Sequence, residues 1–74
     1  MKDARGININ VGDKLEQLVT DDLHTKGTEW VVIGIGIEPS TNKKIAVIKS
    51  PKNYIMCAWQ SELKFFKKKV GVVC

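Results

Sequence analysis

The fold class of this chain is set by the stretch Lys26-Gly27-Thr28-Glu29-Trp30-Val31-Val32-Ile33-Gly34-Ile35. Lys26-Gly27 is typical of a tight turn, and the apolar, β-branched run that follows over residues 30–37 is typical of a long β-strand. Because successive strand residues point to opposite sides, one face is expected to hold Val31, Ile33, Ile35 and Ile37, and the other Trp30, Val32, Gly34 and Gly36. The two glycines predict a sharp bend or a close approach of another backbone.

The rest of the chain has the same period of two, which predicts an all-β protein. Strands are expected over residues 14–19, 30–37, 44–49, 54–59 and 64–66, with a single helical turn at 61–63 before the last of them. Residues 20–28 form a long polar loop, 38–43 a turn cluster, and 50–53 a tight turn in which Pro51 suits the second position. Residues 7–11 alternate and predict an edge strand or an ordered arm, and residues 70–74 could extend the last strand or pair with 7–11.

The length of 74 residues predicts one domain, with a core over about 12–66, an N-terminal arm over 1–11 and a C-terminal tail over 67–74. The hydrophobic fraction of 43% argues against disorder. A core of this size contributes only roughly 3–5 kcal/mol of net stability. A surface that recognises a partner is therefore expected rather than a deep, strained active site.

The order of five short strands, a long first loop, a tight hairpin and a helical turn resembles the SH3-like barrel, over about residues 12–66. Within it, Gly12-Asp13 and Lys26-Gly27-Thr28-Glu29-Trp30-Val31-Val32 are similar to the KOW motif of ribosomal proteins and transcription factors. The chain departs from that motif at Trp30, where the family has glycine, and in its longer loop. The resemblance implies a small five-stranded barrel with a possible extra terminal strand.

The chain also resembles the short SH3-like proteins that phages encode, which implies docking on a host enzyme or a nucleoprotein complex. Signalling SH3 domains have a tryptophan pair after the second loop, where this chain has Lys43-Lys44. Binding of proline-rich peptides is therefore not expected.

The charge distribution favours an anionic partner. The net charge is +4, and from Lys43 onward there are eight lysines and one acid, Glu62. We expect a lysine-rich face that contacts nucleic acid or a nucleoprotein complex, with an exposed aromatic for base stacking. The candidate residues are Lys43, Lys44, Lys49, Lys52, Lys64, Lys67, Lys68, Lys69 and Trp59. Lysine positions a phosphate as a point charge, so weak sequence specificity is expected.

The alternative is a protein-docking module, such as a phage-type inhibitor or adaptor, that uses the acidic loop and exposed aromatics. Its candidate residues are Asp21, Asp22, His24, Glu29, Tyr54 and Trp59. One residue of each adjacent or oppositely facing aromatic pair, Phe65 with Phe66 and Tyr54 with Trp59, should point outward. A homo-oligomer that covers its edge strands is also compatible with this reading.

The sequence predicts no catalytic site, metal or cofactor. Gly34-Ile35-Gly36 lacks the third glycine of a dinucleotide fingerprint. His24 is the single histidine and has no cysteine at ligand spacing. A nucleophile pair of Cys57 with His24 is conceivable, but Cys57 is expected to be a buried packing residue.

The two cysteines, Cys57 and Cys74, form no dense disulfide framework. Residues 1–11 lack the apolar core of a secretory signal, and no apolar run approaches the roughly 20 residues of a membrane span. A cytoplasmic protein with no membrane partner is expected.

Overall fold

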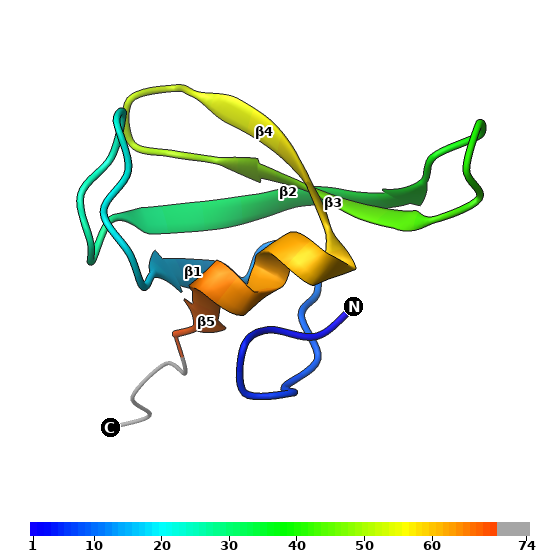
Figure 1. Cartoon of the computed structure of the whole chain (residues 1–74), viewed down its shortest axis with the longest axis horizontal. Helices are drawn as coiled ribbons and strands as arrows, with labels where there is room; N and C mark the ends of the chain where they lie inside the picture. The colour runs from blue at the N-terminus through cyan, green and yellow to red at the C-terminus, as the bar shows by residue number, and fades with distance from the viewer. Residues whose placement is uncertain (70–74) are drawn as a thin grey trace.

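The computed structural model describes residues 1–69 and arranges five antiparallel strands in one sheet (Figure 1). The elements are β1 (Lys14–Gln17), β2 (Glu29–Ile37), β3 (Lys44–Lys49), β4 (Ile55–Trp59), the 3₁₀ helix η1 (Gln60–Phe65) and β5 (Phe66–Lys68). The strand order in the sheet is β4-β3-β2-β1-β5, so β4 and β5 are its two edges. The predicted all-β class and the predicted order of elements are confirmed. No helix in this part of the chain is long and apolar enough to cross a membrane.

The core lies between the sheet and η1, which crosses one face of the sheet in Figure 1. Its buried apolar residues are Ile9, Leu15, Trp30, Val32, Ala46, Ile48, Ala58, Leu63 and Phe66. Trp30 is the largest of them, and its ring meets Phe66 edge to face at a centroid distance of 5.9 Å. Its indole N–H donates to Gln17 Oε1 at 3.0 Å, so the polar end of the side chain is satisfied inside the core.

The side chains of β2 do not alternate regularly between the two faces of the sheet along the whole strand. Its register against β3 shifts between Val32 and Gly34, because Ile33 is an extra residue in a β-bulge. Beyond the bulge Ile35 lies opposite the buried Ala46, as Val32 lies opposite the buried Ile48. The prediction that Ile35 and Ile37 share a face with Val31 was therefore wrong, and the bulge lies directly before Gly34, one of the two glycines.

The predicted last strand over residues 64–66 was also wrong, because Lys64 and Phe65 belong to η1. The helix begins after Trp59, whose backbone N–H donates to Glu62 Oε1 at 3.2 Å, and it buries Leu63 completely. The chain becomes extended only at Phe66, which is 5% exposed whereas Phe65 is 41% exposed. The prediction that one residue of this aromatic pair points outward is confirmed.

The N-terminal arm packs on the sheet without forming a strand over residues 7–11. Its one ladder contact is an isolated antiparallel bridge between Lys2 and Asn8. Ile9 is 2% exposed within the core, and Ala4 N–H donates to the carbonyl of Phe66 at 2.9 Å. The arm therefore covers the outer edge of β5. The predicted pairing of residues 70–74 lies outside the described residues.

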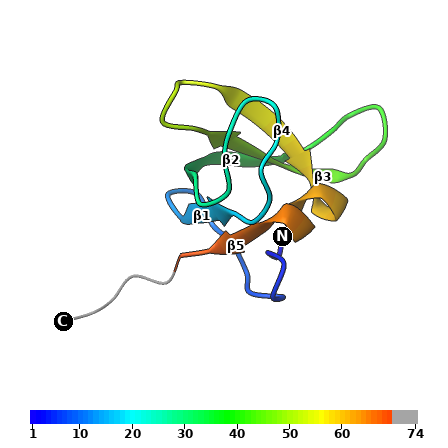
Figure 2. The same cartoon turned by 60° about the vertical axis from the view of Figure 1, so that its left-hand side comes forward.

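The two ends of the sheet carry different loops. The long loop between β1 and β2 lies beside the β3–β4 turn, and the β2–β3 turn projects from the opposite end (Figures 1 and 2). A hydrogen bond joins the long loop to the β3–β4 turn: Lys52 Nζ donates to the carbonyl of Leu23 at 3.0 Å. Lys52, in the β3–β4 turn, and Lys43, in the β2–β3 turn, therefore lie at opposite ends of the sheet.

Candidate nucleic-acid interface

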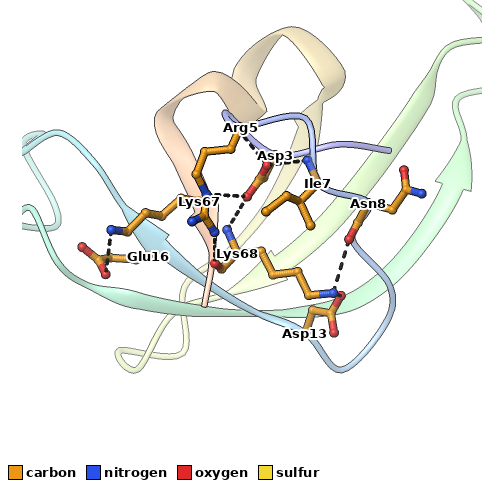
Figure 3. Close-up of polar contacts among 8 residues, drawn as sticks. All are labelled: Asp3, Arg5, Ile7, Asn8, Asp13, Glu16, Lys67 and Lys68. Carbon is orange, nitrogen blue, oxygen red and sulfur yellow. Dashed lines mark hydrogen bonds and ion pairs between the residues drawn. The ribbon is translucent and has the colours of Figure 1, made fainter. Parts of the chain in front are cut away.

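The lysine run on β5 is paired with carboxylates rather than free. Lys67 Nζ lies 4.0 Å from Glu16, Lys68 Nζ 3.2 Å from Asp13, and Lys69 Nζ 2.9 Å from Glu29. The first two of these ion pairs are drawn in Figure 3, beside the arm. The arrangement follows from topology: β5 and β2 flank β1, so cations from the end of the chain meet acids from its first thirty residues.

The pair between Lys69 and Glu29 shifts the pKa of both groups. The hydrogen bond from Lys69 lowers the pKa of Glu29 and, in return, raises the pKa of Lys69. Lys14 Nζ lies 3.6 Å from the same carboxylate and adds to the lowering. Glu29, a candidate of the docking alternative, therefore lies in β2 and forms ion pairs with Lys14 and Lys69.

Three further candidate lysines come from the end of β3, the β3–β4 turn and η1. Lys49 ends β3, and Lys52 lies in the β3–β4 turn, where it holds the long loop. Lys64 lies on η1 with its Nζ 5.1 Å from the centroid of the Phe65 ring. Lys49 lies opposite Val31, which lies opposite Lys14, so Lys49 is on the same sheet face as Lys67.

Lys43, Lys44 and Trp59 are brought together where the β2–β3 turn meets the end of β4. They line a shallow hollow of about 450 Å³ with Gln60 and Ser61. We call these five residues the Trp59 platform. The Nζ of Lys43 lies 5.4 Å from the centroid of the Trp59 ring, a cation–π contact. Within residues 1–69, neither Lys43 nor Lys44 has a carboxylate within ion-pair distance.

The indole of Trp59 is held at its edge by Glu38, and Lys43 lies over its face. Its Nε1 donates to Glu38 Oε2 at 3.2 Å, and Glu38 Oε1 accepts from the Ser40 hydroxyl at 2.6 Å. The residue remains 40% exposed. An aromatic ring that is held at its edge and accessible at its face can stack on another planar group.

Sequence reasoning missed two neighbours of this platform, Glu38 and Lys2. The backbone of Lys2 exchanges two hydrogen bonds with the side chain of Gln60: its N–H donates to Oε1 at 2.9 Å, and its carbonyl accepts from Nε2 at 2.7 Å. These residues are 58 positions apart, and no spacing in the sequence signals the contact. Glu38 belongs to the polar turn cluster over residues 38–43. That cluster predicted a turn, but not the hydrogen bond between Glu38 and Trp59.

The acidic loop is held together by its own polar groups. Asp21 Oδ1 accepts the backbone N–H groups of Leu23 at 2.9 Å and of His24 at 2.7 Å, and these bonds, the one from His24 first, lower the pKa of Asp21. Asp22 is exposed. Asp21, a candidate of the docking alternative, therefore stabilises the loop through its carboxylate.

His24 is buried, although it was a candidate for surface docking. It is 4% exposed, with its ring 4.7 Å from that of Trp30 and 5.6 Å from that of Tyr54. Its Nε2 lies 2.9 Å from the hydroxyl of Ser50. Tyr54 itself is 45% exposed and Trp59 40%, so both aromatics of β4 and its preceding turn reach solvent.

Cys57 is exposed, which corrects the prediction of a buried thiol. It lies opposite Val47 on the side of β4 that carries Ile55 and Trp59, away from the buried Ala58. Within residues 1–69, no three His, Cys, Asp or Glu side chains are placed to hold a metal ion.

A second hollow of about 310 Å³ lies between the long loop, β4 and η1. It is lined by Gln17, Val19, Asp21, Met56, Glu62, Phe65 and Phe66. Its lining is mostly apolar, with the carboxylates of Asp21 and Glu62 as its charged members.

Comparison with known proteins gave no relative: no protein-family model, no curated protein and no solved structure matches this chain.

Proposed function

We propose that this chain is a non-enzymatic binding module that holds single-stranded nucleic acid at the Trp59 platform. The observation that carries the proposal is the grouping of Lys43, Lys44 and the exposed Trp59 around one shallow hollow. The order of elements supports the SH3-like barrel as the scaffold of such a module.

The chemistry of the platform suits a base with its neighbouring phosphates. Stacking of a base on an aromatic side chain contributes about 1–3 kcal/mol and tolerates any base. The exposed side chain of Lys43 can leave the Trp59 ring and bind a phosphate while a base takes its place. Lysines bind phosphate as point charges, so the proposal implies affinity with little sequence preference.

A salt titration tests the proposal directly. Binding of a fluorescent oligothymidylate is measured by anisotropy at several salt concentrations. The double variant Lys43→Gln, Lys44→Gln should flatten the dependence of log affinity on log salt by about 1.4, because each phosphate contact to a single strand contributes about 0.7. Trp59→Ala should weaken binding about tenfold or more through lost stacking.

The matched control is Lys67→Gln, Lys69→Gln, which removes the same charge from β5. Because these lysines already neutralise Glu16 and Glu29, the control should leave the salt slope close to that of the wild type. No binding by the wild type at low salt, or an equal loss in the control, would refute the proposal. Thermal unfolding of Trp59→Ala checks that the variant still folds.

Docking of a protein is the second candidate, and the hollow beside η1 favours it. Met56, Phe65 and the carboxylates of Asp21 and Glu62 would suit an extended peptide with an apolar and a basic side chain. Phe65→Ala, which truncates an exposed apolar member of this hollow, should then abolish capture of a partner from cell extract, whereas Asp22→Asn should not. A wild type that captures a protein in this manner and ignores the oligonucleotide would favour docking.

A further inference from the structure

The outer edge of β5 is closed by the N-terminal arm. Ala4 N–H donates to the carbonyl of Phe66. Arg5 Nη2 donates to the carbonyl of Lys68 at 2.7 Å, and Lys68 N–H donates to Asp3 Oδ2 at 2.6 Å (Figure 3). The backbone groups that a new strand would need on this side are therefore occupied.

The outer edge of β4 is open along the part of the chain that the structure describes. Ser50 N–H donates to the carbonyl of Tyr54, so Ser50 and Tyr54 form a hydrogen-bonded pair at the end of the β3–β4 ladder. Hydrogen-bonded pairs alternate along an antiparallel ladder, so Met56 and Ala58 bond to β3 while Ile55 and Cys57 direct their N–H and C=O groups outward. Among residues 1–69, no other strand lies beyond β4, which runs along the upper edge of the sheet in Figure 1.

The chemistry of β4 suits pairing with another strand. No charged residue occurs from Asn53 to Ser61, whereas β5 carries Lys67 and Lys68. The side chains on its outer face are exposed, with Ile55 at 57%. Proteins usually protect a sheet edge with charge, proline or a covering segment, and β4 has none of these within the described residues.

We propose that β4 pairs antiparallel with β4 of a second copy of this chain, so that the two sheets become continuous across a two-fold axis at Cys57. This register sets Ile55 opposite Trp59 of the second copy, an aromatic and β-branched pair of the kind that stabilises sheets. It also matches the outward backbone groups, since residues 55, 57 and 59 have the same parity. The N–H of Trp59 exchanges its exposed bond to Glu62 for one to the carbonyl of Ile55 in the second copy.

A second copy of the chain fits this edge, because β4 is uncharged and two copies related by a two-fold axis place no like charges opposite each other along the strand. Head-to-tail pairing of β4 with β5 is blocked by the arm, so the contact closes as a dimer rather than extending into a filament. The dimer and the nucleic-acid site share Trp59, so the dimer is tested without nucleic acid and through Ile55, which lies outside the Trp59 platform.

Sedimentation of the protein without nucleic acid tests the dimer. The wild type should sediment at twice the mass of the 8.3 kDa chain. Ile55→Lys should raise the dimer dissociation constant at least about tenfold, because it places two lysines in an uncharged edge. Ile37→Lys is the matched control, since Ile37 is also 57% exposed but lies on β2, and it should leave the dimer intact.

Amide hydrogen exchange of the wild type locates the contact without any variant. Exchange at Ile55 and Cys57 should slow as the protein concentration rises, while exchange at exposed amides of the β2–β3 turn should not change. A wild type that stays monomeric at every concentration overturns the proposal. So does a dimer that survives Ile55→Lys, or one that leaves the amides of Ile55 and Cys57 unprotected.

Discussion

The two edges of the sheet have opposite chemistry. At β5 an arm, a buried carboxylate and a row of ion pairs occupy the edge, whereas β4 presents an uncharged strand and an accessible tryptophan. The polar side chains at β5 are used within the fold, so we expect their removal to reduce stability. Lys43 and Lys44, near the end of β4, form no ion pair within residues 1–69, so we expect their removal to reduce binding.

The lysines show why a charge count is a poor guide to a binding face. Lys67–Lys69 are the densest run of cations in the sequence, and each has a carboxylate within 4.0 Å. Lys43 and Lys44 are fewer but lie beside an aromatic ring. Variants of the residues that hold β5 test this contrast through their effect on stability.

Asp3→Asn should give the largest loss of stability. The side chain of Asp3 is fully buried and accepts the backbone N–H groups of Arg5 and Ile7 through Oδ1 and of Lys68 through Oδ2. An asparagine must point its NH₂ group at one of these donors and also loses the charge. We expect a loss of about 2–3 kcal/mol in the free energy of unfolding, measured by urea denaturation.

Asp22→Asn is the control for this change, because it is the same substitution at an exposed position. It should leave the unfolding free energy within about 0.5 kcal/mol of the wild type. Equal stability of Asp3→Asn and Asp22→Asn would mean that the arm does not fasten the β5 edge.

The pH dependence of stability tests the same carboxylate. Burial raises the pKa of Asp3, but the three backbone donors, with Lys68 first, and the charge of Arg5 outweigh it and hold the pKa below its usual value. A lowered pKa in the folded state stabilises the fold above the unfolded pKa of about 3.9, and this contribution is lost as the pH falls through the folded value. The urea midpoint of the wild type should therefore fall on acidification from pH 7 to about pH 3 more than that of Asp3→Asn.

Asp21 and Glu29 also have lowered pKa values, so some acid sensitivity should remain in Asp3→Asn. The test lies in the difference between the two proteins, which should shrink as the pH falls. A constant difference would show that the carboxylate of Asp3 acts through its shape and not its charge.

Local patterns predicted the elements of this fold better than its contacts. Alternation predicted the first four strands, because this signal involves neighbouring residues, and Gly34 lies directly after the bulge in β2. The exact site of the bulge and the change of face at Ile35 depend on the register against β3, which no short window contains. The helical propensity of residues 60–65 was underestimated because burial of Leu63, a tertiary contact, decides it.

The same limit applies to the candidate site. The sequence pointed to Lys43, Lys44 and Trp59, but it gave equal weight to Lys67–Lys69 and assigned His24 to the surface. Ion pairs across β1 and the packing of His24 between Trp30 and Tyr54 arise from segments distant in sequence. Such pairing cannot be read from composition.

Lys69→Gln should have the smallest effect, because its ion pair with Glu29 is exposed and Glu29 keeps Lys14 as a partner. The urea midpoint should fall slightly at low salt and match the wild type near 1 M salt, where charges are screened beyond about 3 Å. Lys26→Gln, which removes a loop lysine, is the control for net charge. If Lys69→Gln were as costly as Asp3→Asn at every salt concentration, the surface pairs and not the buried carboxylate would fasten β5. The contrast between the two edges would then be one of charge density rather than of burial.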